Sequence, residues 1–107
     1  MLKGMGNMLK MAQEMQARMQ TLQEELERKT ASGSAGGDMV TAVVNGKKEL
    51  KSLAISREVV NPDDIEMLQD LIVAAVKDAT RKAEEMARSE MAAITGGMNI
   101  PGFPGMM

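Results

Sequence analysis

The chain has 107 residues, with 13 Lys and Arg against 15 Asp and Glu and a formal net charge of −2. It contains 13 Met and 1 Phe but no Cys, His, Trp or Tyr, which excludes disulfides and Cys- or His-based metal sites and removes the commonest general base. The longest uncharged apolar run, residues 71–76, is far too short to cross a bilayer, so we expect a soluble cytoplasmic single domain without a membrane partner.

The first predicted element is a long helix over residues 3 to about 30. Its apolar residues recur at spacings of three and four, which places them along one seam: Met5, Met8, Ala12, Met15, Met19, Leu22 and Leu26. A helix of this length spans roughly 40 Å, so a short hairpin cannot cover the seam and another helix must lie along it. The Met sulfurs are possible Cu(I) ligands, but the seam favours packing, and we expect no metal or cofactor.

Residues 30–37 contain three Gly and two Ser, and they predict a flexible connection. A phosphate-binding loop is disfavoured there because such a loop follows a strand and precedes a helix.

A β-hairpin is predicted over residues 37–56. Asn45-Gly46 favours a two-residue type I′ turn between a strand that ends at Val44 and a returning strand. The period of two places Leu53 and Ile55 on one face of the returning strand and Leu50 and Ala54 on the other.

The hairpin is apolar on both faces, and two strands alone are marginally stable in water. We therefore expect a homodimer. The candidate interface residues are Val40, Ala42, Val43, Val44, Leu53 and Ile55.

A second helix is predicted over residues 62–95, because Asn61 can cap it and Pro62 suits its first turn. The small residues Ala75, Ala79 and Ala83 would let a partner helix approach closely. Residues 98–107 contain two Pro and two Gly, so we expect a flexible tail that is dispensable for folding. The fold class is then α+β: helix, hairpin (with room for a short third strand), helix.

Basic residues recur on both helices and after the turn. The candidate DNA-binding residues are Lys3, Lys10, Arg18, Lys47, Lys48, Lys51, Lys77, Arg81, Lys82 and Arg88. Dimerisation would double these charges into a surface for phosphates. From the residues alone, ordinary solvated helix faces are favoured for the helical set, and the hairpin lysines equally suit protection of a sheet edge.

Three groups of residues, in this order and spacing, point to a known family. They are Gly36-Gly37 leading to Val40 and Asn45-Gly46, Leu68 through Leu71-Ile72 and Ala75 to Asp78-Ala79, and Gly96-Gly97 to Pro101-Gly102. Over essentially its full length the chain resembles the YbaB/EbfC family of bacterial nucleoid-associated proteins. The resemblance implies a tweezer-like, intertwined homodimer that binds double-stranded DNA at the nucleoid with little or modest sequence preference. Roles in chromosome organisation and gene regulation would follow.

Two other classes of function remain to be weighed. An enzyme acting on a small-molecule substrate is disfavoured because Ser and Thr occur without a plausible base. A prefoldin-like holdase, or another protein-interaction module with Met-rich helical arms, stays open because Met surfaces suit promiscuous binding. Phosphate binding weakens steeply with salt and apolar binding does not, so salt dependence separates DNA binding from the holdase.

Overall fold

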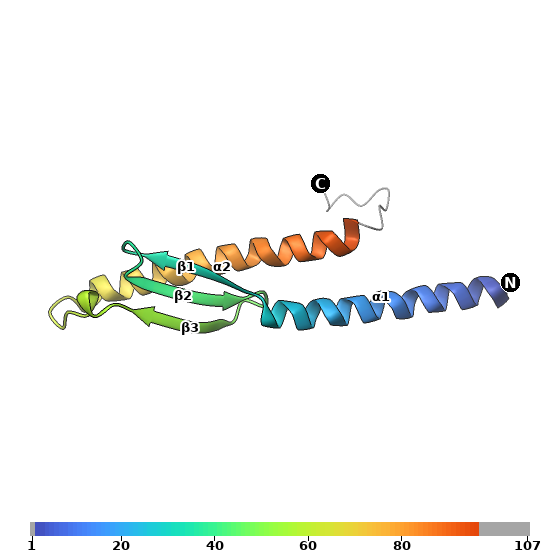
Figure 1. Ribbon diagram of the computed structural model, residues 1–107, viewed down its shortest axis with the longest axis horizontal. Coiled ribbons are helices and arrows are strands. Elements are labelled where there is room, and N and C mark those ends of the chain that lie inside the picture. Colours follow the sequence, from blue (N-terminus) through green and yellow to red (C-terminus); the bar gives the residue numbers. More distant parts are fainter. Residues whose placement is uncertain (1, 97–107) are drawn as a thin grey trace.

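The computed structural model describes residues 2–96, an elongated molecule with principal extents of 75 × 25 × 16 Å. The elements in order are α1 (Leu2–Arg28), β1 (Thr30–Ala35), β2 (Val40–Asn45), β3 (Leu50–Ile55), a short 3-10 helix η1 (Arg57–Val59) and α2 (Ile65–Gly96). The first half of α2 covers the sheet (Figure 1). The helix α1 projects from one end of the sheet, and the second half of α2 extends from that same end (Figure 1). The predicted order of helix, sheet and helix is confirmed. The predicted tail, residues 98–107, lies outside the described residues.

The sheet has three antiparallel strands in the order β1-β2-β3. The prediction of a flexible connection over residues 30–37 is therefore wrong for its first six residues, which form β1. The small residues of β1, which are typical of a linker, allow this strand to lie in close contact with α2. A Cβ on Gly33 would stand 2.1 Å from the backbone N of Ala79, a distance that only glycine permits. The connection between β1 and β2 is therefore only a turn over residues 36–39. In this turn Gly36, Gly37 and Asp38 have φ of 65°, 64° and 71°.

The core lies between α2 and the sheet. Ala75, Ala79 and Ala83 are fully buried, as expected of a small-residue stripe, but they receive the sheet and not a partner helix. On the sheet side Val40 and Ala42 are 0% exposed and Val44 is 1% exposed. These three candidate interface residues are covered by α2 of their own chain. They have no surface left for a second copy, and the candidate interface narrows to Val43, Leu53 and Ile55.

The connection between β2 and β3 differs from the predicted type I′ turn. It spans residues 46–49, and its left-handed residue is Lys48, with φ of 67°. Asn45 is fully buried, and its Oδ1 accepts from the N–H of Lys47 at 3.0 Å and of Glu49 at 2.9 Å. Its Nδ2 donates to the carbonyl of Glu27 at 3.2 Å and to Glu49 Oε1 at 2.8 Å. Asn45 therefore fastens the loop to the end of α1, a role that the turn prediction missed.

The pairing of β3 with β2 shifts register between Val43 and Val44, so that Val43 opposes Ser52 and Val44 opposes Leu50. The shift skips Lys51. It places Leu50 on the same face as Leu53 and Ile55, whereas strict alternation predicts opposite faces. These three side chains face the side that α2 covers, yet they are 52%, 37% and 39% exposed because α2 packs on β1 and β2.

The second helix begins three residues later than predicted. Asp64 Oδ1 accepts from the N–H of Met67 at 3.1 Å and caps the helix. Asn61, the predicted cap, instead accepts from the N–H of Asp63 at 3.0 Å and closes a turn ahead of the helix.

Candidate nucleic-acid interface

The outer part of α1, residues 2–21, is here called the α1 arm. Lys10 and Arg18 are exposed on it, and Lys3 belongs to its first turn with a side chain outside the described part. The outer part of the Met seam is uncovered: Met5, Met8 and Met19 are 68%, 72% and 36% exposed. Only the base of the helix is packed, since Leu22 and Leu26 are 1% and 6% exposed. The arm therefore presents both cations and apolar surface to solvent.

Arg81 and Lys82 are brought together at one carboxylate. Arg81 pairs with Asp78 at 3.0 Å and with Glu85 at 3.0 Å, and Lys82 pairs with Asp78 at 3.1 Å. The pKa of Asp78 lies below its usual value because Lys82, the backbone N–H of Ser34 and Arg81 all donate to it. The charges of Arg81 and Lys82 are thus largely balanced by acids of α2 itself.

Two of the three hairpin lysines also have acidic partners. Lys47 pairs with Glu27 at 2.9 Å, and its hydrogen bond lowers the pKa of that carboxyl. Lys48 reaches Glu84 of α2 at 3.5 Å. Lys51, the residue skipped by the register shift, is exposed and makes no ion pair within residues 2–96.

Lys77 and Arg88 lie on the outer face of α2, because their helical positions are opposite the buried Ala79. Both are exposed and have no ion-pair partner in the described part of the chain. Arg57 of η1 has the same character and was missed from the sequence. Its place directly after a strand that turns out to be an open edge is visible only in the fold.

The structure therefore divides nine of the ten predicted DNA-binding residues into two groups, and Lys3 is left out because its side chain lies outside the described part. Those exposed and without an ion pair among residues 2–96 are Lys10, Arg18, Lys51, Lys77 and Arg88, whereas Lys47, Lys48, Arg81 and Lys82 are paired. A cation already balanced by a nearby carboxylate has less to gain from a phosphate. The unpaired set is the better candidate interface.

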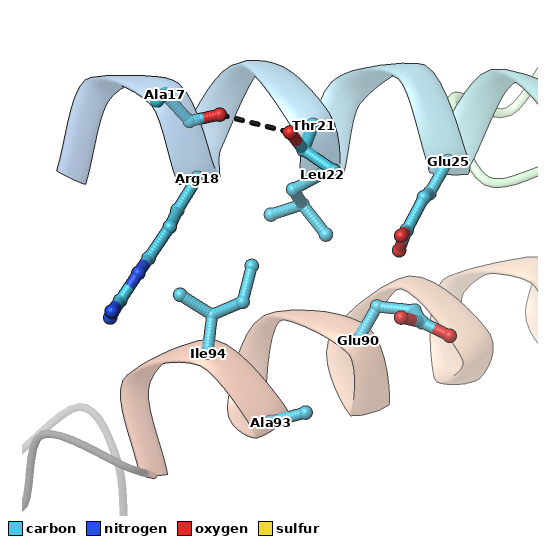
Figure 2. Close-up of a pocket in the computed structure, with 8 residues that line it drawn as sticks. All are labelled: Ala17, Arg18, Thr21, Leu22, Glu25, Glu90, Ala93 and Ile94. Carbon is cyan, nitrogen blue, oxygen red and sulfur yellow. Dashed lines mark hydrogen bonds between the residues drawn. The ribbon is translucent and has the colours of Figure 1, made fainter. Parts of the chain in front are cut away.

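Where α1 and α2 approach each other, a pocket of about 430 Å³ separates them. Leu22 of α1 and Ile94 of α2 point toward one another across it, and Glu25 and Glu90 lie at the end nearer the sheet (Figure 2). Lys29, just after α1, hydrogen-bonds Glu90, which raises the pKa of the lysine. This contact ties the base of α1 to the second half of α2.

Within residues 2–96, no three His, Cys, Asp or Glu side chains are grouped so as to hold a metal ion. No helix in that range is long and apolar enough to cross a membrane.

Comparison with known sequences gives three results. The pattern of the YbaB/EbfC DNA-binding family matches residues 1–98. The chain is 59% identical over 97 residues to the nucleoid-associated protein TTE0040 of Caldanaerobacter subterraneus, covering 91% of this chain and 87% of that one. It is 54% identical over 102 residues to a nucleoid-associated protein of Syntrophobacter fumaroxidans, covering 94% and 93%.

Among solved structures, the uncharacterized protein HP0035 from Helicobacter pylori matches with a TM-score of 0.67 and 26% identity, covering 85% of this chain and 91% of that one. The resemblance drawn from the glycine and hairpin motifs is thereby confirmed, and this chain belongs to the YbaB/EbfC DNA-binding family.

Proposed function

We propose that this protein is a homodimeric, nucleoid-associated protein that binds double-stranded DNA mainly through backbone phosphates. Its place in the cell would be the nucleoid, where it would contribute to chromosome organisation and gene regulation. The observation that carries the phosphate mode is the set of unpaired, exposed cations on both helices, above all Lys10 on the α1 arm and Lys77 and Arg88 on α2. Lys and Arg that neutralise phosphates set affinity without reading base sequence.

The residues around these cations favour the same mode. The chain has no Trp or Tyr and its 1 Phe lies beyond α2, so no aromatic of residues 2–96 is available to stack on bases. The acidic total is compatible with this mode because the charge is unevenly distributed along the chain. Residues 58–70 contain five acidic residues and no Lys or Arg, whereas the α1 arm carries Lys3, Lys10 and Arg18 against the single acid Glu14.

A second copy is supported first by the α1 arm. An apolar seam at heptad spacing is normally buried against another helix, and the rest of the same chain buries only its base at Leu22 and Leu26. Met8, for example, is 72% exposed. A dimer would bury this surface, and bringing two arms together would also double the number of available cations.

The sheet supports a second copy independently. Its β1 edge is blocked, because α2 lies along it and Asp78 accepts the N–H of Ser34 at 3.2 Å. Within residues 2–96 no strand lies beside the β3 edge, and Leu50, Leu53 and Ile55 of β3 are exposed. An open apolar edge is a template for pairing with another chain. Antiparallel pairing of two β3 strands would extend the sheet across the dimer.

The experiment that tests the phosphate mode is a fluorescence-anisotropy titration of two unrelated duplexes at several salt concentrations. The logarithm of the binding constant should fall linearly with the logarithm of salt, at about 0.9 per neutralised phosphate, with similar slopes for both duplexes. A slope near zero, or strong binding to one duplex alone, would contradict the proposal.

The exposed α1 arm favours one other function. Met5, Met8, Leu9 and Met11 give it a continuous apolar surface of the kind that holdases present to unfolded chains. In that case the protein would suppress aggregation of a denatured client, and the suppression would be insensitive to salt. The same titration, run beside an aggregation assay, separates the two functions.

A further inference from the structure

The pocket between α1 and α2 has an apolar centre and a polar rim. Ala17 and Leu22 line it from α1 and Ala93 and Ile94 from α2, and the rim is formed by Arg18, Thr21, Glu25 and Glu90. Its volume of about 430 Å³ lies within the roughly 300–1,000 Å³ typical of ligand-sized sites. In Figure 2 the side chains of Leu22 and Ile94 face each other across this space.

The rim decides against an anionic occupant. Glu25 and Glu90 place two carboxylates beside the apolar centre, and the cations there are Arg18 and Lys29, the hydrogen-bond partner of Glu90. The rim therefore has no excess of positive charge to attract a DNA phosphate. The chemistry of the pocket suits an uncharged, apolar group.

The chain carries such a segment beside the pocket. Residues 97–107 contain no charged residue, include Met98, Ile100 and the only Phe, Phe103, and follow directly on the last residue of α2, Gly96. Ile94 lines the pocket only two residues before that end. From the end of α2 at Gly96 to Phe103 is seven residues, a reach of about 24 Å when extended, which is enough chain for Phe103 to return to the pocket.

We propose that this pocket is the docking site of the protein's own C-terminal segment, with the ring of Phe103 packed between Leu22 and Ile94. An aromatic ring buries about 150–250 Å², more than any other side chain of this segment offers. Tethering favours the same chain as the source, because a short flexible connection gives an effective concentration of about millimolar. The docked segment bridges the base of the α1 arm and the second half of α2.

The single Phe makes a direct test possible. Full-length protein labelled with 4-fluorophenylalanine gives one ¹⁹F resonance, from position 103. We expect that line to be displaced from the line of a free peptide of residues 97–107. Ala93→Gln should fill the pocket and return the line to the free position. Ala92→Gln is the matched control, since Ala92 is exposed beside Arg88 and Ser89 and does not line the pocket.

The free, flexible segment that composition predicts is the outcome that would overturn the proposal: a wild-type line at the free position, or a displaced line unaffected by Ala93→Gln. A second experiment identifies the chain that supplies the segment. The protein has no native Cys, so Ala17→Cys combined with Pro104→Cys allows one disulfide. A linked product of monomer size supports docking in the same chain. A product of dimer size only would assign the pocket to the segment of a second copy and refute the proposal as stated.

Discussion

The backbone N–H of Ser34 donates a hydrogen bond to Oδ2 of Asp78 at 3.2 Å, so that a carboxylate of α2 takes the outward amide of an edge strand. The same carboxylate holds Lys82 at 3.1 Å and Arg81 at 3.0 Å. One side chain therefore fixes the helix to the sheet and balances two cations.

The lowered pKa of Asp78 predicts how stability depends on acid. Because the carboxylate is favoured in the folded state, its contribution is present above its unfolded pKa of about 3.9 and is lost as pH falls through the lower folded pKa. Asp78→Asn should lower the urea midpoint at pH 7, and its deficit should shrink as pH falls below 4. Glu14→Gln, on the exposed α1 arm, should parallel the wild type. A deficit that stays constant from pH 7 to 2 would contradict this linkage.

Gly33 should not tolerate a methyl group. A Cβ there would lie 2.1 Å from N and 2.6 Å from Cα of Ala79 and 2.7 Å from the carbonyl O of Ala75, all backbone atoms that cannot rotate away. We expect Gly33→Ala to lower the free energy of unfolding by about 3 kcal/mol or more in urea titrations. In the control, Gly6→Ala, the Cβ meets no atom within 4 Å, and higher helix propensity should raise stability by up to about 1 kcal/mol.

Asn45 should contribute far more than a turn residue does. It is buried with four hydrogen bonds, to Glu27, Lys47 and twice to Glu49. Removing them leaves buried groups unpaired, so Asn45→Ala should cost about 2–4 kcal/mol by chemical denaturation. Asn61→Ala, at an exposed site with one such bond, should cost less than about 1 kcal/mol. Equal losses would show that the Asn45 contacts are energetically minor.

The DNA contacts should depend on which cations are free. Lys10→Gln removes an unpaired charge from each arm of a dimer, so it should flatten the salt slope by up to about 1.8. Arg81→Gln should have a smaller effect, because Asp78 and Glu85 already engage that guanidinium. Anisotropy titrations on two unrelated duplexes measure both variants. A larger loss for Arg81→Gln than for Lys10→Gln would mean that DNA breaks the α2 ion pairs on binding.

Leu53 should report on dimerisation. It is 37% exposed at the open β3 edge, so a single chain accommodates a lysine there, whereas an interface would not. Leu53→Lys should therefore shift sedimentation toward monomer with little loss of helical circular dichroism. Val60→Lys, 52% exposed outside the strand, should leave the assembly unchanged. A wild-type protein that sediments as a monomer at micromolar concentration would remove the basis of this prediction.

Much of the architecture could be predicted from sequence because periodicity is strong where elements are long. The heptad seam defines α1, and the Ala75, Ala79 and Ala83 stripe defines the buried face of α2. What could not be predicted depends on contacts between distant segments. The sequence of β1 is that of a linker, and its role as a strand depends on the contact of Gly33 with Ala79. The sequence around Asn45 is that of a turn, and the structural role of Asn45 depends on its hydrogen bond to the end of α1.

The candidate site divides in the same way. The sequence identifies every cation but not its nearest acid. Charged residues three or four apart on a helix, such as Asp78, Arg81 and Glu85, can either pair with one another or remain unpaired. The pairing of Lys47 with Glu27, 20 residues apart, and of Lys48 with Glu84 depends on how the hairpin sits against the helices. The family resemblance indicates DNA as the partner. The fold indicates which cations are unpaired and therefore the better candidates for contacting it.

The two edges of the sheet differ, and this difference would limit how many copies of the chain can associate through the sheet. A sheet with two open edges can add copies without end and form a fibre, because each addition exposes a new edge. Here Asp78 and the body of α2 obstruct the β1 side. Union through β3 would then consume the only accessible edge of both partners, and association would terminate at two subunits. The carboxylate that fixes the helix would thereby also act as a safeguard against polymerisation.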